Sequence, residues 1–197
     1  MENSFEALIA SYIENGVGIC EHFLSDELAN NLKKNLISLQ QQDLLVEAGT
    51  GNSNVIAYDS AVRSDSIYWL DKTHNNEFEN AFFEQIEAFI RYLNESCYTG
   101  ITGYEFHYSL YEKGDFYLQH FDQFQSNSSR KYSMISYLNE QWKAADGGEL
   151  LIHQINNNQT ITPTQGKTVF FKSDELLHEV LVTQTTRMSI TGWLKCD

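Results

Sequence analysis

The second half of the chain alternates short apolar runs with turn residues, and this pattern constrains the fold more than any other feature. The runs are Gly103–Glu112, Phe116–Phe121, Tyr132–Leu138, Glu149–Ile155, Thr168–Lys172, His178–Val182 and Met188–Leu194. The turn signals between them are Lys113–Asp115, Gln125–Ser129, Asp146–Gly148, Asn156–Asn158 and Gln165–Gly166. Many short strands at this spacing predict an antiparallel sandwich or barrel.

The first half shows helical periodicity instead. Ser25 precedes an apolar rhythm that predicts an N-cap and a helix to about Gln42. Asn76–Ser96 is the clearest helix, because its apolar side chains recur on one face. Those side chains are Phe78, Phe82, Phe83, Ile86, Phe89, Ile90 and Leu93. Ala48–Asn54 is typical of a loop, and Asp65–Leu70 of a short strand.

The length of 197 residues fits a single domain. We therefore expect an α+β fold, mainly β, in one domain spanning residues 1–197. Residues 1–100 would form a helical support, and residues 101–197 would form a β-rich core.

The net charge of −14 argues against polyanionic partners such as nucleic acids and anionic membranes. Residues 1–100 hold 5 basic and 16 acidic side chains, and residues 101–197 hold 8 and 11. Phosphate contact needs clustered Lys and Arg, so we expect no nucleic-acid partner and no binding to an anionic membrane.

The N-terminal residues and the cysteines favour a cytoplasmic protein. The first twenty residues lack a basic region and a long apolar run, so they do not read as a secretory signal. No stretch is apolar enough to predict a transmembrane helix. Cys20, Cys97 and Cys196 are odd in number and widely spaced, which is typical of reduced thiols.

His120-Phe121-Asp122 is the first candidate for chemistry. In a strand, residues i and i+2 project from the same face, so the imidazole and the carboxylate would converge on one point. The pair alone is a weak signal, because such pairs arise by chance, and a metal site needs a third ligand.

His178 is the preferred third ligand, and His153 is the rival. Two histidines and one carboxylate form the facial triad of non-haem Fe(II) oxygenases, which leaves positions open for a co-substrate and O₂. Zinc would usually be held by four ligands with more nitrogen or sulfur. A histidine on a solvated strand face explains His153 equally well.

Arg187 supports His178. It follows His178 across the turn Thr183–Thr186, and a hairpin would carry it back alongside the metal strand. A guanidinium that faces inward needs a planar carboxylate partner. The far carboxylate of 2-oxoglutarate would be such a partner if its 2-oxoacid end chelated the iron.

A set of ordered stretches extends this pattern from about Arg63 to Trp193. They are Arg63–Trp69, Tyr111–Asp122, Arg130–Asn139, Trp142, Asp146–Leu150, Phe170–Asp174, His178–Val180 and Thr186–Trp193. With them the chain resembles the 2-oxoglutarate- and Fe(II)-dependent dioxygenases. The likeness is to the prolyl hydroxylase branch, akin to the oxygen-sensing enzymes and their bacterial relatives. The resemblance implies a double-stranded β-helix, a jelly-roll-like core, at residues 101–197.

The resemblance also implies roles for single residues. His120, Asp122 and His178 would bind iron and form the catalytic centre. Arg187 would pair with the distal carboxylate of 2-oxoglutarate, and Tyr137 and Tyr111 would donate hydroxyl hydrogen bonds to the co-substrate. Tyr137 and Tyr111 read equally well as core aromatics in a chain with 11 tyrosines. Arg130 and Trp193 match positions that line the substrate entrance. Asp65 would lie on a segment within residues 1–100 that covers this entrance, and would pair with Arg130 or form an ordinary surface ion pair.

The implied reaction is hydroxylation of a prolyl residue in a protein or peptide. It would use Fe(II), 2-oxoglutarate and O₂, with ascorbate as a reductant, and release succinate and CO₂. In bacterial relatives the implied target is a prolyl residue in a translation elongation factor. Two alternatives stay open. One is hydroxylation of another protein side chain, a free amino acid or a small molecule. The other is a non-catalytic module that binds 2-oxoglutarate or iron.

Overall fold

The computed structural model describes residues 2–52, 55–57, 59–123, 127–155 and 157–196. Its helices are α1 (Glu2–Asn15), α2 (Asp26–Gln41) and α3 (Glu77–Cys97), with 3-10 helices η1 (Lys72–His74) and η2 (Ala144–Asp146). The strands before α3 are β1 (Gly18–Cys20), β2 (Val46–Glu47), β3 (Thr50–Asn52), β4 (Val55–Ala57) and β5 (Ser66–Trp69). The strands after α3 are β6 (Gly103–Tyr111), β7 (Tyr117–His120), β8 (Arg130–Tyr137), β9 (Leu150–His153), β10 (Gln159–Ile161), β11 (Thr168–Lys172), β12 (Leu177–Val180) and β13 (Arg187–Lys195).

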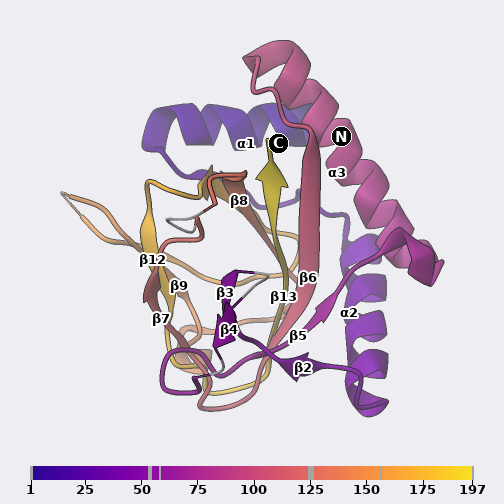
Figure 1. Cartoon of the computed structure of the whole chain (residues 1–197), viewed down its shortest axis with the longest axis vertical. Helices are drawn as coiled ribbons and strands as arrows, with labels where there is room; N and C mark the ends of the chain where they lie inside the picture. The colour runs from indigo at the N-terminus through magenta and orange to yellow at the C-terminus, as the bar shows by residue number, and fades with distance from the viewer. Residues whose placement is uncertain (1, 53–54, 58, 124–126, 156, 197) are drawn as a thin grey trace.

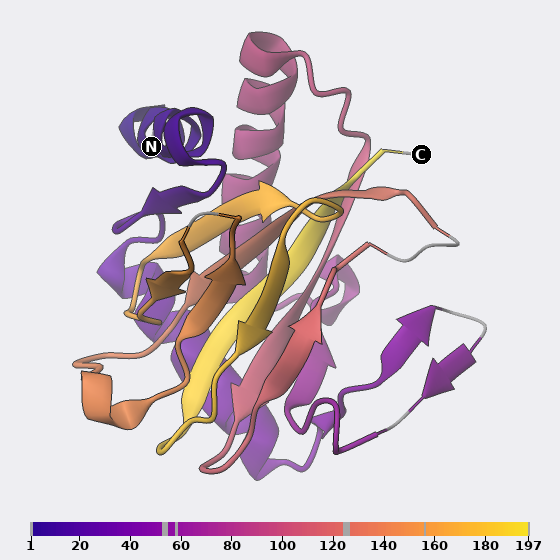
Figure 2. The same cartoon turned by 90° about the vertical axis from the view of Figure 1, so that its left-hand side faces the viewer.

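Two antiparallel sheets form the centre of the molecule. The larger sheet has the order β1-β11-β8-β13-β6-β5-β2, and the smaller one has the order β10-β9-β12-β7. Figure 1 shows α2 and α3 on one side of the larger sheet and the strands β7, β9 and β12 on its other side. The strands β3 and β4 form a separate hairpin that stands away from both sheets in Figure 2. The predicted α+β fold, mainly β and supported by N-terminal helices, is confirmed.

The predicted helices of the first half are confirmed, and their ends have clear causes. The Ser25 hydroxyl accepts a hydrogen bond from the backbone N–H of Leu28 and caps α2. The Asn76 side chain accepts from the backbone N–H groups of Phe78 and Glu79 and caps α3. Within the described residues, no helix has the length and hydropathy that a membrane span requires.

Several elements differ from the sequence prediction. The helix α1 and the strands β1 and β10 were not predicted, because each is short or has weak periodicity. The segment Ala48–Asn54, predicted as a loop, contains the strand β3. Residues 53–54 of that loop, 125–126 of the turn Gln125–Ser129 and 156 of the turn Asn156–Asn158 lie outside the described residues.

The central strand β6 of the larger sheet is buried on both faces, and the two faces differ in chemistry. On β6 the residues Phe106, Tyr108 and Leu110 pack into the apolar core beneath the helices. The alternate residues His107, Ser109 and Tyr111 line a cavity between the sheets instead. The period of two along a strand therefore places apolar side chains under the helices and polar side chains in the cavity.

A substitution at Gly192 tests how closely β13 packs against its neighbouring strand β6. A methyl group there would overlap the Glu105 carbonyl and the Phe106 ring on the neighbouring strand. We expect Gly192→Ala to lower the free energy of unfolding by about 3 kcal/mol, because a close-packed contact cannot admit the extra carbon. Chemical denaturation measures this change. Gly103→Ala in the adjacent strand is the matched control, since its methyl would meet no atom within 4 Å. Equal stability of the two variants would contradict the prediction.

Candidate metal centre and active site

His120, Asp122 and His178 come together where the smaller sheet ends. His120 closes β7 and His178 lies opposite it on β12, while Asp122 follows two residues after His120. Their ligand atoms all lie within 4.8 Å of one another. His120 Nε2 is 3.5 Å from Asp122 Oδ1, and His178 Nε2 is 3.5 Å from Asp122 Oδ2. The predicted triad is therefore assembled.

The backbone sets the tautomer of both histidines. The Nδ1–H of His120 donates to the Leu118 carbonyl at 2.7 Å, and the Nδ1–H of His178 donates to the Leu176 carbonyl at 2.9 Å. A carbonyl oxygen can only accept, so the proton of each neutral ring sits on Nδ1. Both Nε2 lone pairs then face Asp122 and are free to bind a metal.

The charges of the triad suit a divalent cation. Burial lowers the pKa of His178 to about 4, so this imidazole is neutral at physiological pH. Burial opposes ionisation of Asp122, but His178, His120 and the Ser133 hydroxyl outweigh it and hold the pKa of the carboxyl below its usual range. Two imidazole nitrogens and one carboxylate match the donor set of non-haem Fe(II) sites.

Ser133 holds the carboxylate of this triad in place. Its hydroxyl donates to Asp122 Oδ2 at 2.6 Å. We expect Ser133→Ala to weaken Fe(II) binding by about 10- to 100-fold, because groups that orient metal ligands have effects of this size. Ser136→Ala is the control, since that buried hydroxyl contacts Thr168 instead. Anaerobic Fe(II) titration measures both, and an unchanged affinity in Ser133→Ala would contradict the prediction.

The rival ligand His153 lies on the other face of the smaller sheet. Ile152, its neighbour on β9, is the residue in register with His178. His153 therefore points away from the triad, and its Nε2 contacts the Glu179 carboxylate at 2.8 Å. The alternative that His153 completes the triad is wrong.

A cavity of about 440 Å³ opens beside the triad, and Arg187 lies in its wall. The Arg187 side chain is only 1% exposed. Its Nε donates to the Gly148 carbonyl at 2.8 Å and its Nη1 to the Ser189 hydroxyl at 3.4 Å. No carboxylate of the described chain pairs with it. A buried guanidinium in this state calls for an anionic partner from outside the protein.

Arg187 reaches the cavity by a different route from the predicted one. A hairpin beside the metal strand was expected, but β12 belongs to the smaller sheet and β13 to the larger sheet. The turn between them crosses from one sheet to the other. Arg187 therefore faces the cavity from the sheet opposite the strands that carry His120 and His178, which leaves space between the cation and the triad.

Two tyrosine rings flank the guanidinium. The Arg187 carbon Cζ lies 4.9 Å from the Tyr111 ring centre and 5.2 Å from that of Tyr137. The Tyr137 hydroxyl is buried without a hydrogen-bond partner in the described structure. Burial raises the pKa of Tyr137 to about 12, so the hydroxyl keeps its proton. An unused donor next to an unpaired cation fits the carboxylate of 2-oxoglutarate.

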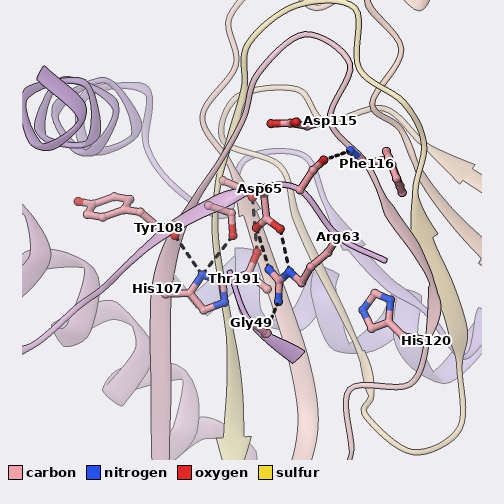
Figure 3. Close-up of polar contacts among 12 residues, drawn as sticks. Gly49, Arg63, Asp65, His107, Tyr108, Asp115, Phe116, His120 and Thr191 are labelled. Carbon is pink, nitrogen blue, oxygen red and sulfur yellow. Dashed lines mark hydrogen bonds and ion pairs between the residues drawn. The ribbon is translucent and has the colours of Figure 1, made fainter. Parts of the chain in front are cut away.

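Of the predicted entrance residues, Arg130 and Trp193 line the cavity, whereas Asp65 is buried outside its lining. Asp65 does not pair with Arg130: both its oxygens accept hydrogen bonds from Arg63, at 2.8 and 2.7 Å (Figure 3). Arg130 instead donates to Glu105 at 2.8 Å and lies 3.4 Å above the Trp193 ring centre. Arg63 lies two residues from Asp65 on the same segment. The bidentate Arg63–Asp65 pair therefore forms in place of the expected Asp65–Arg130 pair.

Three cavity residues were missed by sequence reasoning. The Tyr117 ring stacks on His120 with ring centres 3.5 Å apart, and Arg63 lies 4.3 Å above that same tyrosine ring. His107 is buried in the cavity wall. Arg63 and Tyr117 lie within the sequence stretches that carry the family resemblance, and this position could have indicated that they belong to the site. His107 lies outside those stretches, so the sequence offered no such indication for it.

Residues 106–195 match a protein-family model, the 2OG-Fe(II) oxygenase superfamily. A prolyl-4-hydroxylase from Pseudomonas putida is 28% identical, with 98% of this chain and 99% of that chain covered and a TM-score of 0.87. A Trichoplax adhaerens prolyl hydroxylase, solved with a peptide fragment of a hypoxia inducible factor, is 21% identical. It covers 98% of this chain and 90% of that chain, with a TM-score of 0.88.

A third similar structure is a viral collagen prolyl hydroxylase from Paramecium Bursaria Chlorella virus-1 with 2-oxoglutarate. It is 17% identical and covers 93% of this chain and 97% of that chain, with a TM-score of 0.64. These neighbours confirm the double-stranded β-helix fold. In the match over residues 106–195, the shared fold and the assembled triad, this chain is similar to the 2OG-Fe(II) oxygenase superfamily, and this likeness implies Fe(II) and 2-oxoglutarate as cofactors.

Proposed function

We propose that this oxygenase hydroxylates a prolyl residue of a protein substrate, with succinate and CO₂ as co-products. One observation carries the proposal. The likeness to the Pseudomonas putida prolyl-4-hydroxylase runs over nearly the full length of both chains, and the assembled triad accompanies it. Residues 101–197 would then form the catalytic core, and residues 1–100 the support and the segment that covers the substrate.

Each part of the site has a task in this reaction. His120, Asp122 and His178 hold Fe(II), which together with 2-oxoglutarate and O₂ supplies the oxidising chemistry. Arg187 and the Tyr137 hydroxyl hold the far carboxylate of 2-oxoglutarate, and Tyr111 packs beside it. Because Arg187 is anchored to the Gly148 carbonyl, its remaining N–H groups are oriented before the co-substrate arrives. The enclosed wall keeps water away from the reacting centre.

The cavity mouth fits an extended peptide. The side chains of Val46, Trp69 and Phe121 line it and are exposed to solvent, so they offer an apolar rim. Arg130 and Trp193 lie in the cavity wall and would contact the substrate. The buried Asp65 would act on the substrate through Arg63, which it holds in the cavity wall. The Trichoplax adhaerens enzyme was solved with a peptide, which supports a protein partner here.

The test is a search for hydroxyproline in proteins of the host organism. Proteins from cells with and without this gene are compared by mass spectrometry for the mass of one added oxygen on proline. We expect at least one proline to lose the modification in the deletion strain, and a translation elongation factor is the first candidate to inspect. No change on any proline would overturn the prolyl assignment.

The same comparison, together with assays of succinate release and 2-oxoglutarate binding by the purified protein, separates the alternatives. Added oxygen on another side chain would indicate a different protein hydroxylase. Succinate release that small molecules stimulate and peptides do not would indicate a small-molecule oxygenase. Binding of 2-oxoglutarate without succinate release, across a broad set of substrates, would indicate a binding module.

A further inference from the structure

His107 is a buried cavity residue that neither the triad nor the co-substrate pocket uses. It lies on β6, opposite Trp69 of β5 on one side and Thr191 of β13 on the other. The side chain is 2% exposed, yet it lines the same cavity as His120. A buried polar side chain in an active-site wall requires a hydrogen-bonding role.

The hydrogen bonds of the ring determine its tautomer. Its Nδ1 lies 3.0 Å from the Tyr108 carbonyl oxygen and 3.1 Å from the Ser109 hydroxyl. The carbonyl can only accept, so Nδ1 carries the proton. Burial, assisted by the positive charge of Arg63, lowers the pKa of His107 to about 4. The imidazole is therefore neutral, and Nε2 presents a bare lone pair.

This lone pair has no donor within the described part of the chain. Arg63 lines the same cavity, but its three hydrogen bonds in the described structure go to Asp65 and the Gly49 carbonyl, and none goes to His107. The figure shows the second ring nitrogen of His107 on the side turned toward Arg63, away from the two Nδ1 contacts. The Trp193 indole N–H also has no partner, so it does not donate to His107.

Two indoles hold the ring in this orientation. The Trp69 ring meets it edge-on with centres 5.0 Å apart, and the Trp193 ring lies 5.7 Å away. The two indoles therefore give this part of the cavity wall apolar ring surfaces beside the Nε2 acceptor, with the charged side chains of Arg63, Glu105 and Arg130 in the same wall. Apolar ring surfaces beside one acceptor fit a compact apolar ring that carries an N–H group close beside it.

We propose that His107 Nε2 accepts a hydrogen bond from the backbone N–H of the residue that follows the target proline. This inference rests on the proposed prolyl function. The nitrogen of a prolyl residue is a tertiary amide without a hydrogen, so the nearest N–H belongs to the next residue. The indoles would contact the pyrrolidine ring, and His107 would accept the hydrogen bond from the peptide N–H that follows it.

Small proline amides test this contact directly. The probes are N-acetyl-proline methylamide, which has this N–H, and N-acetyl-proline dimethylamide, which lacks it. They are titrated into the anaerobic Fe(II)–2-oxoglutarate complex of the full chain. We expect the wild type to bind the methylamide about tenfold more tightly than the dimethylamide, as one hydrogen bond in a dry pocket allows.

Two variants of His107 separate the hydrogen bond from packing. His107→Phe keeps a ring between the indoles but has no acceptor, so it should bind both probes equally. His107→Gln has an acceptor within reach and should regain part of the preference. A preference that persists unchanged in His107→Phe would overturn the inference while leaving the prolyl function standing. Failure of the wild type to bind either probe would overturn both.

Nitrogen NMR of the histidine-labelled wild type gives a second readout that does not depend on how the variants fold. We expect a neutral His107 with its proton on Nδ1. The methylamide should shift the Nε2 resonance, and the dimethylamide should leave it in place. Equal shifts with the two probes, or a proton already on Nε2, would contradict the proposed contact.

Discussion

His120→Ala should abolish succinate formation from 2-oxoglutarate, by at least about a thousandfold, because the metal provides the reactive chemistry and its binding needs all three ligands. The remaining pair, Asp122 and His178, would hold Fe(II) with two donors at most from this triad. Succinate release is measured under excess Fe(II), so that slow metal loss does not hide residual activity. Full turnover in His120→Ala would disprove the assignment of the metal centre.

His153→Ala is the matched control for this experiment. His153 is also a strand histidine beside a carboxylate, but it faces away from the cavity and contacts Glu179. A surface pair of this kind contributes little to stability. We therefore expect near wild-type succinate formation from His153→Ala. Similar losses in the two variants would mean that any histidine change in this sheet disturbs the fold.

Arg187→Lys should raise the KM for 2-oxoglutarate by about 10- to 100-fold, since lysine keeps the charge but loses the planar, bidentate geometry. Arg187 is buried and anchored at Nε, so the shorter reach of lysine cannot be offset by movement of the chain. The measurement is succinate release as a function of 2-oxoglutarate concentration. Restoration of turnover at saturating 2-oxoglutarate would show that the metal centre is intact.

Two further variants complete this test. Tyr137→Phe removes one neutral hydrogen bond and should raise the same KM by a smaller factor, about three- to tenfold. Arg91→Lys changes an exposed arginine on α3 and should leave the KM unchanged. An unaltered KM in Arg187→Lys would show that the far carboxylate of the co-substrate binds elsewhere.

Local rules made part of the site predictable. His120 and Asp122 are two residues apart, and the period of two along a strand is enough to place both side chains on one face. The helices α2 and α3 follow from apolar periodicity and from the capping side chains of Ser25 and Asn76. Each of these features depends on neighbours in the chain, so a single sequence contains the information.

Contacts between distant segments were harder to predict. The expected pair of Asp65 and Arg130 was wrong, because Arg63 lies beside Asp65 and takes both of its oxygens. His107 gave no signal at all. Both faces of β6 are buried, so its pattern does not distinguish residues that pack under helices from residues that line a cavity.

The sequence by itself determined the β-rich core, the capped helices and the pairing of His120 with Asp122, because these depend on local periodicity and short-range hydrogen bonds. Only the tertiary structure decided that His178 rather than His153 faces the metal centre, and that Arg187 reaches the cavity from the opposite sheet. These choices depend on strand register and on how two sheets pack. A shift of one residue in register would turn each side chain to the other face.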